Sequence, residues 1–352
     1  MRLKRFTATV AAMLFVVVFF TSDVWAQKIY LLVSADTAPY EKGRNIGPAN
    51  RASMSLLENA FRQNVPAKQL VPYGENSYEN EEGQSVKIDS PWLGPNVLDN
   101  SKNMEEKLLK AISSCPAGSN DTIVFCYFGH GGYVNGEHHL AMPNDGPLVR
   151  RKRLSRALQA KGCRLAVLMT ESCSSVPGDM LAEFAEPCAI PAATISPLFD
   201  SLFIKSRGLA DFNSSTKPEF GMAPPFGGLM ILAMTSVCEP CRNGNQITFK
   251  PTESGYGIFW QFKNQRLSWS KFKSHLMKKE GEIFKEIFPN GIPHKKGSWV
   301  QKTQTPHFFS LPNGNGYRQH RCFLKRLLAR LHCKHRRCHC RRTSQIRVGC
   351  CR

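Results

Sequence analysis

The chain has 352 residues, enough for one large α/β domain or two smaller ones. Its hydrophobic content of 42% and charged content of 21% are ordinary for a globular protein. The net charge of +20 is unusual, but the last acidic residue is Glu286 and fifteen Lys and Arg follow it. Only about +5 remains on residues 1–286, which excludes a uniformly basic body and assigns the basicity to the C-terminal end.

Residues 1–26 read as an export signal. The stretch MRLKR is positively charged, TATVAAMLFVVVFF is apolar, and Val24 and Ala26 occupy the small-residue positions before a cut ahead of Gln27. A membrane anchor is the alternative, but the apolar run is shorter than the ~20 residues that span a bilayer. We therefore expect a secreted or periplasmic protein, cleaved near Ala26.

Strand and helix patterns alternate through the body of the chain. Helical patterns cover residues 50–64, 97–113, 149–161, 255–264 and 269–288, whereas 73–95 has the composition of a surface loop. Compact apolar runs predict strands at 28–35, 121–132, 163–170 and 227–236. This alternation is typical of an α/β fold in which helices cover both faces of a mostly parallel sheet.

Two of these strands end in residues whose side chains can take part in catalysis. FGHGG places His130 at the end of one strand, and TESCSS places Cys173 at the end of the next. Functional groups of parallel sheets gather beyond the carboxyl ends of the strands. If the two strands are neighbours, the imidazole and the thiol lie together at the same edge of the sheet.

A thiol and an imidazole at that edge can cleave an acyl bond. A free thiol has a pKa of roughly 8.5, so Cys173 needs a base such as His130 to become a nucleophile, and the imidazolium can then protonate the leaving amine. The backbone N–H groups of Gly131 and Cys173 are the expected oxyanion donors. The sequence identifies no acidic partner for His130.

The motifs YFGHGG and AVLMTESCSS, in this order, resemble those of the caspase-like cysteine peptidases, in particular the bacterial metacaspase-type members. The resemblance extends over roughly residues 28–288 and includes LLVSADTAPYEKGRNIGPANRASMSLLENAF at the start, LMILAMTSVCEPC as a late core strand and GYGIFWQFKNQRLSWSKFKSHL at the end. It implies a caspase-like three-layer α/β/α sandwich over residues 27–312, with His130 as the base and Cys173 as the nucleophile of a cysteine-type endopeptidase.

The resemblance also suggests a substrate preference. Metacaspase-type members usually carry Asp-x-Cys, and here the acidic position is Glu171. A carboxylate in the pocket for the residue before the cleaved bond favours Arg or Lys, and Asp36 is a second acidic wall in this reading. Glu-x-Cys also resembles the legumains, which prefer Asn, so this alternative stays open. Caspases proper carry a glutamine there, which argues against cleavage after Asp.

The remaining cysteines and histidines have simpler interpretations. Cys126 and Cys163 lie within or against apolar strands and are expected to be core thiols. The Cys238-x-x-Cys241 pair has no second pair near it, so packing or a disulfide is favoured over metal or redox chemistry. His138 and His139 are expected to be structural or exposed.

The basic run RRKR at residues 150–153 has two interpretations. The favoured one is a solvated first turn of a helix, because the apolar residues that follow keep the helical period. The alternative is a self-cleavage site for an enzyme that cuts after Arg.

Residues 313–352 form a basic Cys/His-rich tail with twelve Lys and Arg, no acidic residue and six cysteines. We expect it to be disordered or an amphipathic helix that contacts a polyanion or a membrane surface. Its Cys and His spacing matches no standard zinc site. This tail supports a second hypothesis, in which a non-catalytic caspase-like scaffold binds polyanions or membranes. No cofactor is predicted, and no calcium-binding loop is recognisable, although metacaspase-like enzymes include calcium-activated members.

Overall fold

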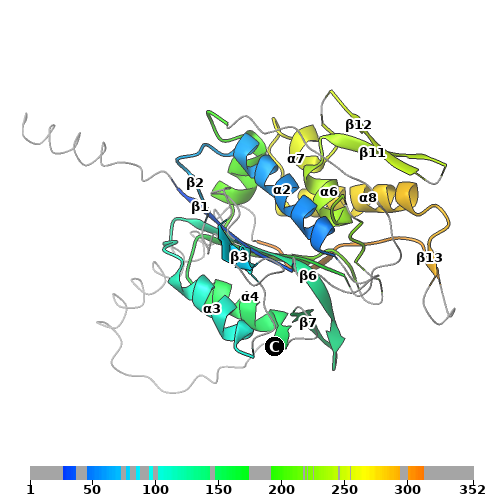
Figure 1. The fold of residues 1–352 in the computed structure, drawn as a ribbon. Coiled ribbons are helices and arrows are strands. Elements are labelled where there is room, and N and C mark those ends of the chain that lie inside the picture. Colours follow the sequence, from blue (N-terminus) through cyan, green and yellow to red (C-terminus); the bar gives the residue numbers. More distant parts are fainter. Residues whose placement is uncertain are drawn as a thin grey trace, which may run out of the picture.

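The computed structural model describes residues 27–36, 46–72, 77–79, 85–87, 95–97, 102–142, 147–173, 192–216, 219, 221–224, 226–244, 246–253, 255–293 and 300–312. The expected export signal and the expected basic tail lie outside these residues, so both stay predictions. The described part is a three-layer α/β/α structure in which one central sheet separates two groups of helices (Figure 1). The predicted α/β sandwich is therefore confirmed.

The central sheet is mostly parallel. Along its main path the strands follow the order β15-β10-β9-β6-β1-β2; all neighbours are parallel except the edge strand β15, and short β5 also pairs with β1 in parallel. Beyond the sheet edge, β6 continues into an antiparallel extension with β7 and β8. The strands of the sheet are β1 (Ile29–Ala35), β2 (Leu70–Pro72), β5 (Pro95–Val97), β6 (Thr122–Val134), β7 (Glu137–Ala141), β8 (Leu148–Arg150), β9 (Leu165–Cys173), β10 (Gly208–Asn213) and β15 (His307–Ser310).

Helices cover both faces of this sheet (Figure 1). One face carries α2 (Gly47–Asn64), α5 (Pro197–Phe199) with a π-helical turn at Asp200–Ile204, α6 (Leu229–Thr235), α7 (Ile258–Gln261) and α8 (Trp269–Ile287). The other face carries α3 (Met104–Ser114) and α4 (Arg151–Ala160). Three two-stranded pairs are not hydrogen-bonded into this sheet: β3 (Ser77–Glu79) with β4 (Ser85–Lys87), β11 (Cys238–Asn243) with β12 (Gln246–Pro251), and β13 (Ile292–Pro293) with β14 (Val300–Gln301). Among the described helices, none is long and apolar enough to cross a bilayer.

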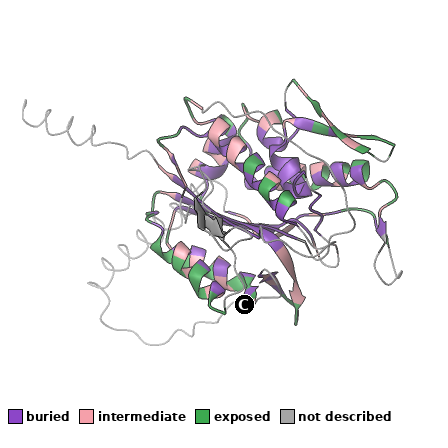
Figure 2. Ribbon diagram, viewed as in Figure 1, coloured by how far each residue is buried: buried purple, intermediate pink, exposed green. Residues whose placement is uncertain are grey.

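Alternation along the strands divides the core into two clusters. On β6, Val124, Cys126 and Phe128 face the α2/α6/α8 layer, whereas Phe125 and Tyr127 face the α3/α4 layer. Successive side chains of a strand point to opposite faces, and both faces of a covered parallel sheet must be apolar. This explains the unbroken apolar runs of β1, β6 and β9, which are buried on both sides (Figure 2). Cys126 is fully buried, as expected for a core thiol.

One predicted strand is a helix. Residues 227–236 were expected to form a late core strand, but 229–235 form α6, and all of its side chains are buried. A short apolar run surrounded by protein has no polar face, so its periodicity does not distinguish strand from helix. The sheet instead takes β10 and β15 as its next strands, and neither was predicted. The second helix begins at Met104, later than the predicted residue 97.

The basic run RRKR does not form a uniformly solvated turn. Arg150 ends β8 and Arg151 begins α4, where the Arg151 side chain is only 3% exposed. Arg153 pairs with Glu105 of α3, and Lys152 is exposed. Self-cleavage after Arg151 would require the first turn of α4 to open and an ion pair to Asp211 to break, so the structure favours a structural role for this arginine.

A second buried arginine binds groups at the amino ends of the central strands. Arg164 lies one residue before β9, and its guanidinium donates to the carbonyls of Asn120, Phe203 and Ser206 at 2.7–2.9 Å. The same group donates to the Thr122 hydroxyl at 2.7 Å, at the start of β6. Arg164 therefore joins the amino ends of β6 and β9 to the segment before β10.

We expect Arg164→Met to lower the free energy of unfolding by about 2–4 kcal/mol, because several buried acceptors lose their donor at ~1–3 kcal/mol each. Urea denaturation of the variant and the wild type measures this difference. The matched variant Arg156→Met changes an exposed arginine of α4 and should shift the free energy by less than about 0.5 kcal/mol. Equal stabilities of the two variants would contradict the anchoring role.

Candidate active site

The two residues predicted to form the catalytic dyad lie on neighbouring strands. β6 and β9 are parallel partners over nine consecutive residue pairs, from Thr122 with Leu165 to His130 with Cys173. The pairing places the backbones of His130 and Cys173 directly side by side at the carboxyl end of the sheet. The side chain of Cys173 and residues 174–191 lie outside what the structure describes.

The backbone at His130 is held by Tyr127. The buried Tyr127 hydroxyl lies 2.7 Å from the His130 carbonyl oxygen and 2.8 Å from that of Ala141 on β7. The intervening Gly129 permits this contact, because a Cβ there would lie 2.5 Å from the tyrosine oxygen. Tyr127 thus fixes the point at which β6 leaves the sheet and enters the β6–β7 extension. A tyrosine two residues before a glycine was the available sequence signal.

Gly131, an expected oxyanion donor, lies in this extension opposite Leu140. A Cβ at Gly131 would lie 2.7 Å from the Cβ of Ser172 and 2.9 Å from the His139 carbonyl oxygen. The glycine is therefore needed for the close approach of β9, independently of any catalytic role. The proposed donor role of the Gly131 and Cys173 N–H groups stays a prediction.

The acidic residue of the Glu-x-Cys motif is buried. Glu171 is 3% exposed, and its carboxyl oxygens accept from the backbone N–H groups of Met230 and Ile231 at 3.2 Å each. Burial raises the pKa of Glu171 to about 8, and these two hydrogen bonds only partly oppose the shift. Glu280 of α8 is also buried, and the pKa of its carboxyl is raised by burial and by Glu171.

This placement makes Glu171 an anchor between β9 and α6. We expected its carboxylate at the base of a substrate pocket, but here it is largely neutral at neutral pH and already engaged by the protein. The geometry favours a positioning role, and contact with a basic substrate side chain stays a prediction.

Asp36, the second expected acidic wall, is fully buried at the end of β1. Its backbone N–H donates to the Phe128 carbonyl, and its own carbonyl accepts from the Asn50 amide at 2.5 Å. Asn50 also reaches the Phe128 carbonyl at 3.3 Å, so one amide of α2 joins the ends of β1 and β6. In the sequence, Asn50 could have been recognised as a polar residue on the apolar face of the helix predicted over residues 50–64. Contact of Asp36 with substrate stays a prediction, and residues 37–45 beyond it lie outside the described part.

The other expected assignments are located as follows. His139 is half-buried on β7, whereas His138 is buried and takes part in a polar network on the α3/α4 face. Cys238 and Cys241 lie on β11 and are not joined by a disulfide, and Cys163 is half-buried against the α3/α4 cluster. Within the described residues, no three or more His, Cys, Asp and Glu side chains come together in a way that could hold a metal ion.

The buried carboxyl of Glu171 gives a pH-dependent prediction. Its folded-state pKa of about 8 lies above the ordinary value of 4.5, so its contribution to stability is complete below about pH 4.5 and is lost as the pH rises to about 8. We expect the unfolding free energy of the wild type to fall relative to Glu171→Gln by about 1.4 kcal/mol per pH unit across that range. Urea denaturation at several pH values measures the difference.

The matched variant Glu282→Gln removes an exposed carboxyl of α8. Its stability should follow that of the wild type across the same pH range. Parallel curves for the wild type and Glu171→Gln would show that Glu171 is not buried as a neutral group.

No protein-family model matches the sequence, and no curated protein matches it. Solved structures with a similar arrangement include caspase-1 from Spodoptera frugiperda, at 8% identity over 83% of this chain and 90% of that chain, with a TM-score of 0.42. The Drosophila initiator caspase Dronc is similar at 15% identity over 82% and 80%, with a TM-score of 0.37. A protein from Geobacter sulfurreducens is similar at 13% identity over 82% and 95%, also with a TM-score of 0.37. At these identities and TM-scores the likeness concerns the arrangement of strands and helices, not the chemistry.

Proposed function

We propose that the chain is a cysteine-type endopeptidase of the caspase-like kind, with Cys173 as nucleophile and His130 as general base. The observation that carries the proposal is the pairing of His130 with Cys173 at the carboxyl ends of two adjacent parallel strands. Catalytic groups of such sheets gather at these ends, and a thiol and an imidazole are the two groups that acyl transfer by cysteine requires.

In this mechanism His130 takes the proton of the Cys173 thiol, and the thiolate attacks the peptide carbonyl. The oxyanion of the tetrahedral intermediate is stabilised by the N–H groups of Gly131 and Cys173. The imidazolium then gives its proton to the leaving amine, which leaves an acyl-enzyme for water to hydrolyse. No cofactor takes part in this scheme.

We further propose that the enzyme cleaves after Arg or Lys, with Glu171 as the specificity residue. A cationic side chain at this carboxyl would lower its pKa and form a charge-assisted hydrogen bond. A second preference, for Asn, is favoured by the raised pKa of Glu171, because a neutral carboxyl can both donate to and accept from an amide. We also propose export with cleavage near Ala26, so the enzyme is to be assayed from Gln27 onward.

The dyad is tested by hydrolysis of fluorogenic peptides by the chain beginning at Gln27, with and without calcium. We expect Cys173→Ala and His130→Ala each to lower kcat/KM by about 10³-fold or more, because nucleophile and base act as a unit. Cys241→Ala alters a free thiol on β11 and should retain full activity.

The absence of Cys173-dependent hydrolysis, including after removal of residues 313–352, would exclude the peptidase. The alternative is a non-catalytic scaffold that binds polyanions through the basic tail. Salt-sensitive retention on immobilised heparin that disappears when the tail is removed would then support it.

Substrate preference is tested with peptides that end in Arg, Lys, Asn or Asp. If Glu171 binds the cation, Glu171→Gln should lower kcat/KM for Arg peptides by about 100-fold and change that for Asn peptides far less. Preferential cleavage after Asn by the wild type would contradict the basic preference and favour the amide one. Cleavage after Asp would contradict both.

A further inference from the structure

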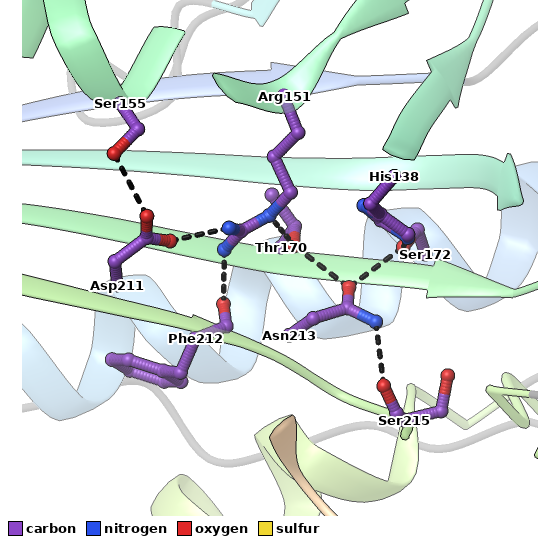
Figure 3. Close-up of polar contacts among 9 residues, drawn as sticks. All are labelled: His138, Arg151, Ser155, Thr170, Ser172, Asp211, Phe212, Asn213 and Ser215. Carbon is purple, nitrogen blue, oxygen red and sulfur yellow. Dashed lines mark hydrogen bonds and ion pairs between the residues drawn. The ribbon is translucent and has the colours of Figure 1, made fainter. Parts of the chain in front are cut away.

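A chain of buried hydrogen bonds crosses the α3/α4 face of the sheet next to the paired ends of β6 and β9 (Figure 3). Its centre is the side-chain oxygen of Asn213 on β10, which accepts from the hydroxyls of Thr170 and Ser172 at 2.7 Å each. Arg151 donates to the Thr170 oxygen at 3.0 Å, and the His138 ring nitrogen Nε2 lies 3.2 Å from the Ser172 oxygen. We call these five residues the Asn213 network.

Only one assignment of donors and acceptors satisfies the hydrogen bonds around Asn213 and Ser172. The Asn213 amide nitrogen donates to the Ser215 carbonyl at 3.0 Å, so its oxygen is the acceptor for both hydroxyls. Because Ser172 gives its own proton to Asn213, its oxygen must accept one from Nε2 of His138. The histidine is therefore held as the tautomer that carries its proton on Nε2.

The surroundings of His138 keep it neutral. The ring is buried and packs against Tyr133 and Phe309, with ring centroids 5.0 and 6.3 Å away. Burial and, to a smaller extent, the charges of Arg151, His139 and His307 together lower the pKa of His138 to about 3. Nδ1 has no hydrogen-bond partner among the described residues, so a second ring proton would be both buried and unpaired.

At the other end of the Asn213 network, an ion pair holds Arg151 in place. Arg151 is ion-paired with Asp211 of β10 and donates to the Phe212 carbonyl at 2.8 Å. Asp211 also accepts from the Ser155 hydroxyl of α4 at 2.8 Å. The network therefore runs from a neutralised buried charge through Ser172, the residue directly before Cys173, to His138.

We propose that Ser172 and Asn213 are positioning residues for the Cys173–His130 pair, an inference that rests on the proposed function. Ser172 joins the end of β9 to β10 through Asn213 and to β7 through His138, and β7 is the strand that pairs with β6 beyond His130. One hydroxyl thus holds the nucleophile-bearing strand in place from both sides. Misplacement by about 1 Å can lower the rate about 100-fold.

A purely structural role is the rival explanation, and the chain supplies a control for it. Arg164 makes an equally buried set of hydrogen bonds at the opposite end of β9. Arg164→Met should cost stability without displacing Cys173 from His130. A substitution in the Asn213 network should also displace Cys173 relative to His130.

The decisive comparison is Asn213→Leu with Asn213→Asp, beside Ser172→Ala and Arg164→Met. Leu keeps the size of Asn213 but has no acceptor, whereas Asp keeps an oxygen for both hydroxyls and, when burial keeps it protonated, a donor to the Ser215 carbonyl. We expect Asn213→Leu and Ser172→Ala to lower kcat about 10- to 100-fold with KM changed less than about threefold. Asn213→Asp should recover most of the loss, and Arg164→Met should retain the wild-type kcat.

A second readout does not depend on peptide hydrolysis. The rate at which iodoacetamide alkylates Cys173 is followed by peptide mass spectrometry as a function of pH, which reports the thiolate that His130 supports. The midpoint pH of the alkylation rate should be higher in Asn213→Leu and Ser172→Ala than in the wild type. It should not change in Asn213→Asp or Arg164→Met.

The two readouts separate the possible failures. Absence of hydrolysis in the wild type, with the alkylation shift still present, would overturn the proposed function and leave the positioning role standing. Wild-type alkylation profiles in Asn213→Leu and Ser172→Ala would overturn the positioning role, whatever their stability. If Asn213→Leu does not fold, Ser172→Ala, which removes one hydroxyl, decides by the same measurements.

Discussion

The parallel pairing of β6 with β9 is the constraint on which the rest of the site depends. Nine consecutive residue pairs bring His130 beside Cys173, although 42 residues separate them in the sequence. A slip of one residue would turn every side chain of β9 to the other face of the sheet. Because both faces are covered by helices, the two hydrophobic clusters oppose such a slip over the whole length of the strand.

The end of β9 is fixed through side chains on both of its faces. Glu171 points to the α2/α6/α8 layer and accepts from the first turn of α6, whereas Ser172 points to the α3/α4 layer and joins the Asn213 network. Two adjacent residues before Cys173 are thus bound in opposite directions. Rigid support of this kind is what a nucleophile needs, since catalytic geometry must be in place before the substrate arrives.

The sequence predicted the parts of this arrangement that depend on local pattern. The apolar strands that end at His130 and Cys173, and the helices on the two faces, follow from periodicity and composition. The helix at 229–235 did not follow, because a fully buried segment has no polar face. Asn213 was missed, and His138 was expected only to be structural or exposed, because their roles depend on β10 and β7, short strands whose neighbours are set by tertiary contacts. Arg151 stood in a run of four basic residues, and only the structure distinguishes the buried one from its exposed neighbours.

The two anchors of β9 respond to pH in opposite ways. As the pH rises toward about 8, Glu171 ionises beside a second buried carboxyl, Glu280, and its burial becomes unfavourable. As the pH falls toward about 3, His138 acquires a proton that Arg151 opposes and that finds no acceptor among the described groups. Both anchors are intact only between these limits. The two contributions to the stability of the end of β9 are therefore largest together at weakly acidic pH, above the ordinary pKa of a carboxyl and below that of an imidazole.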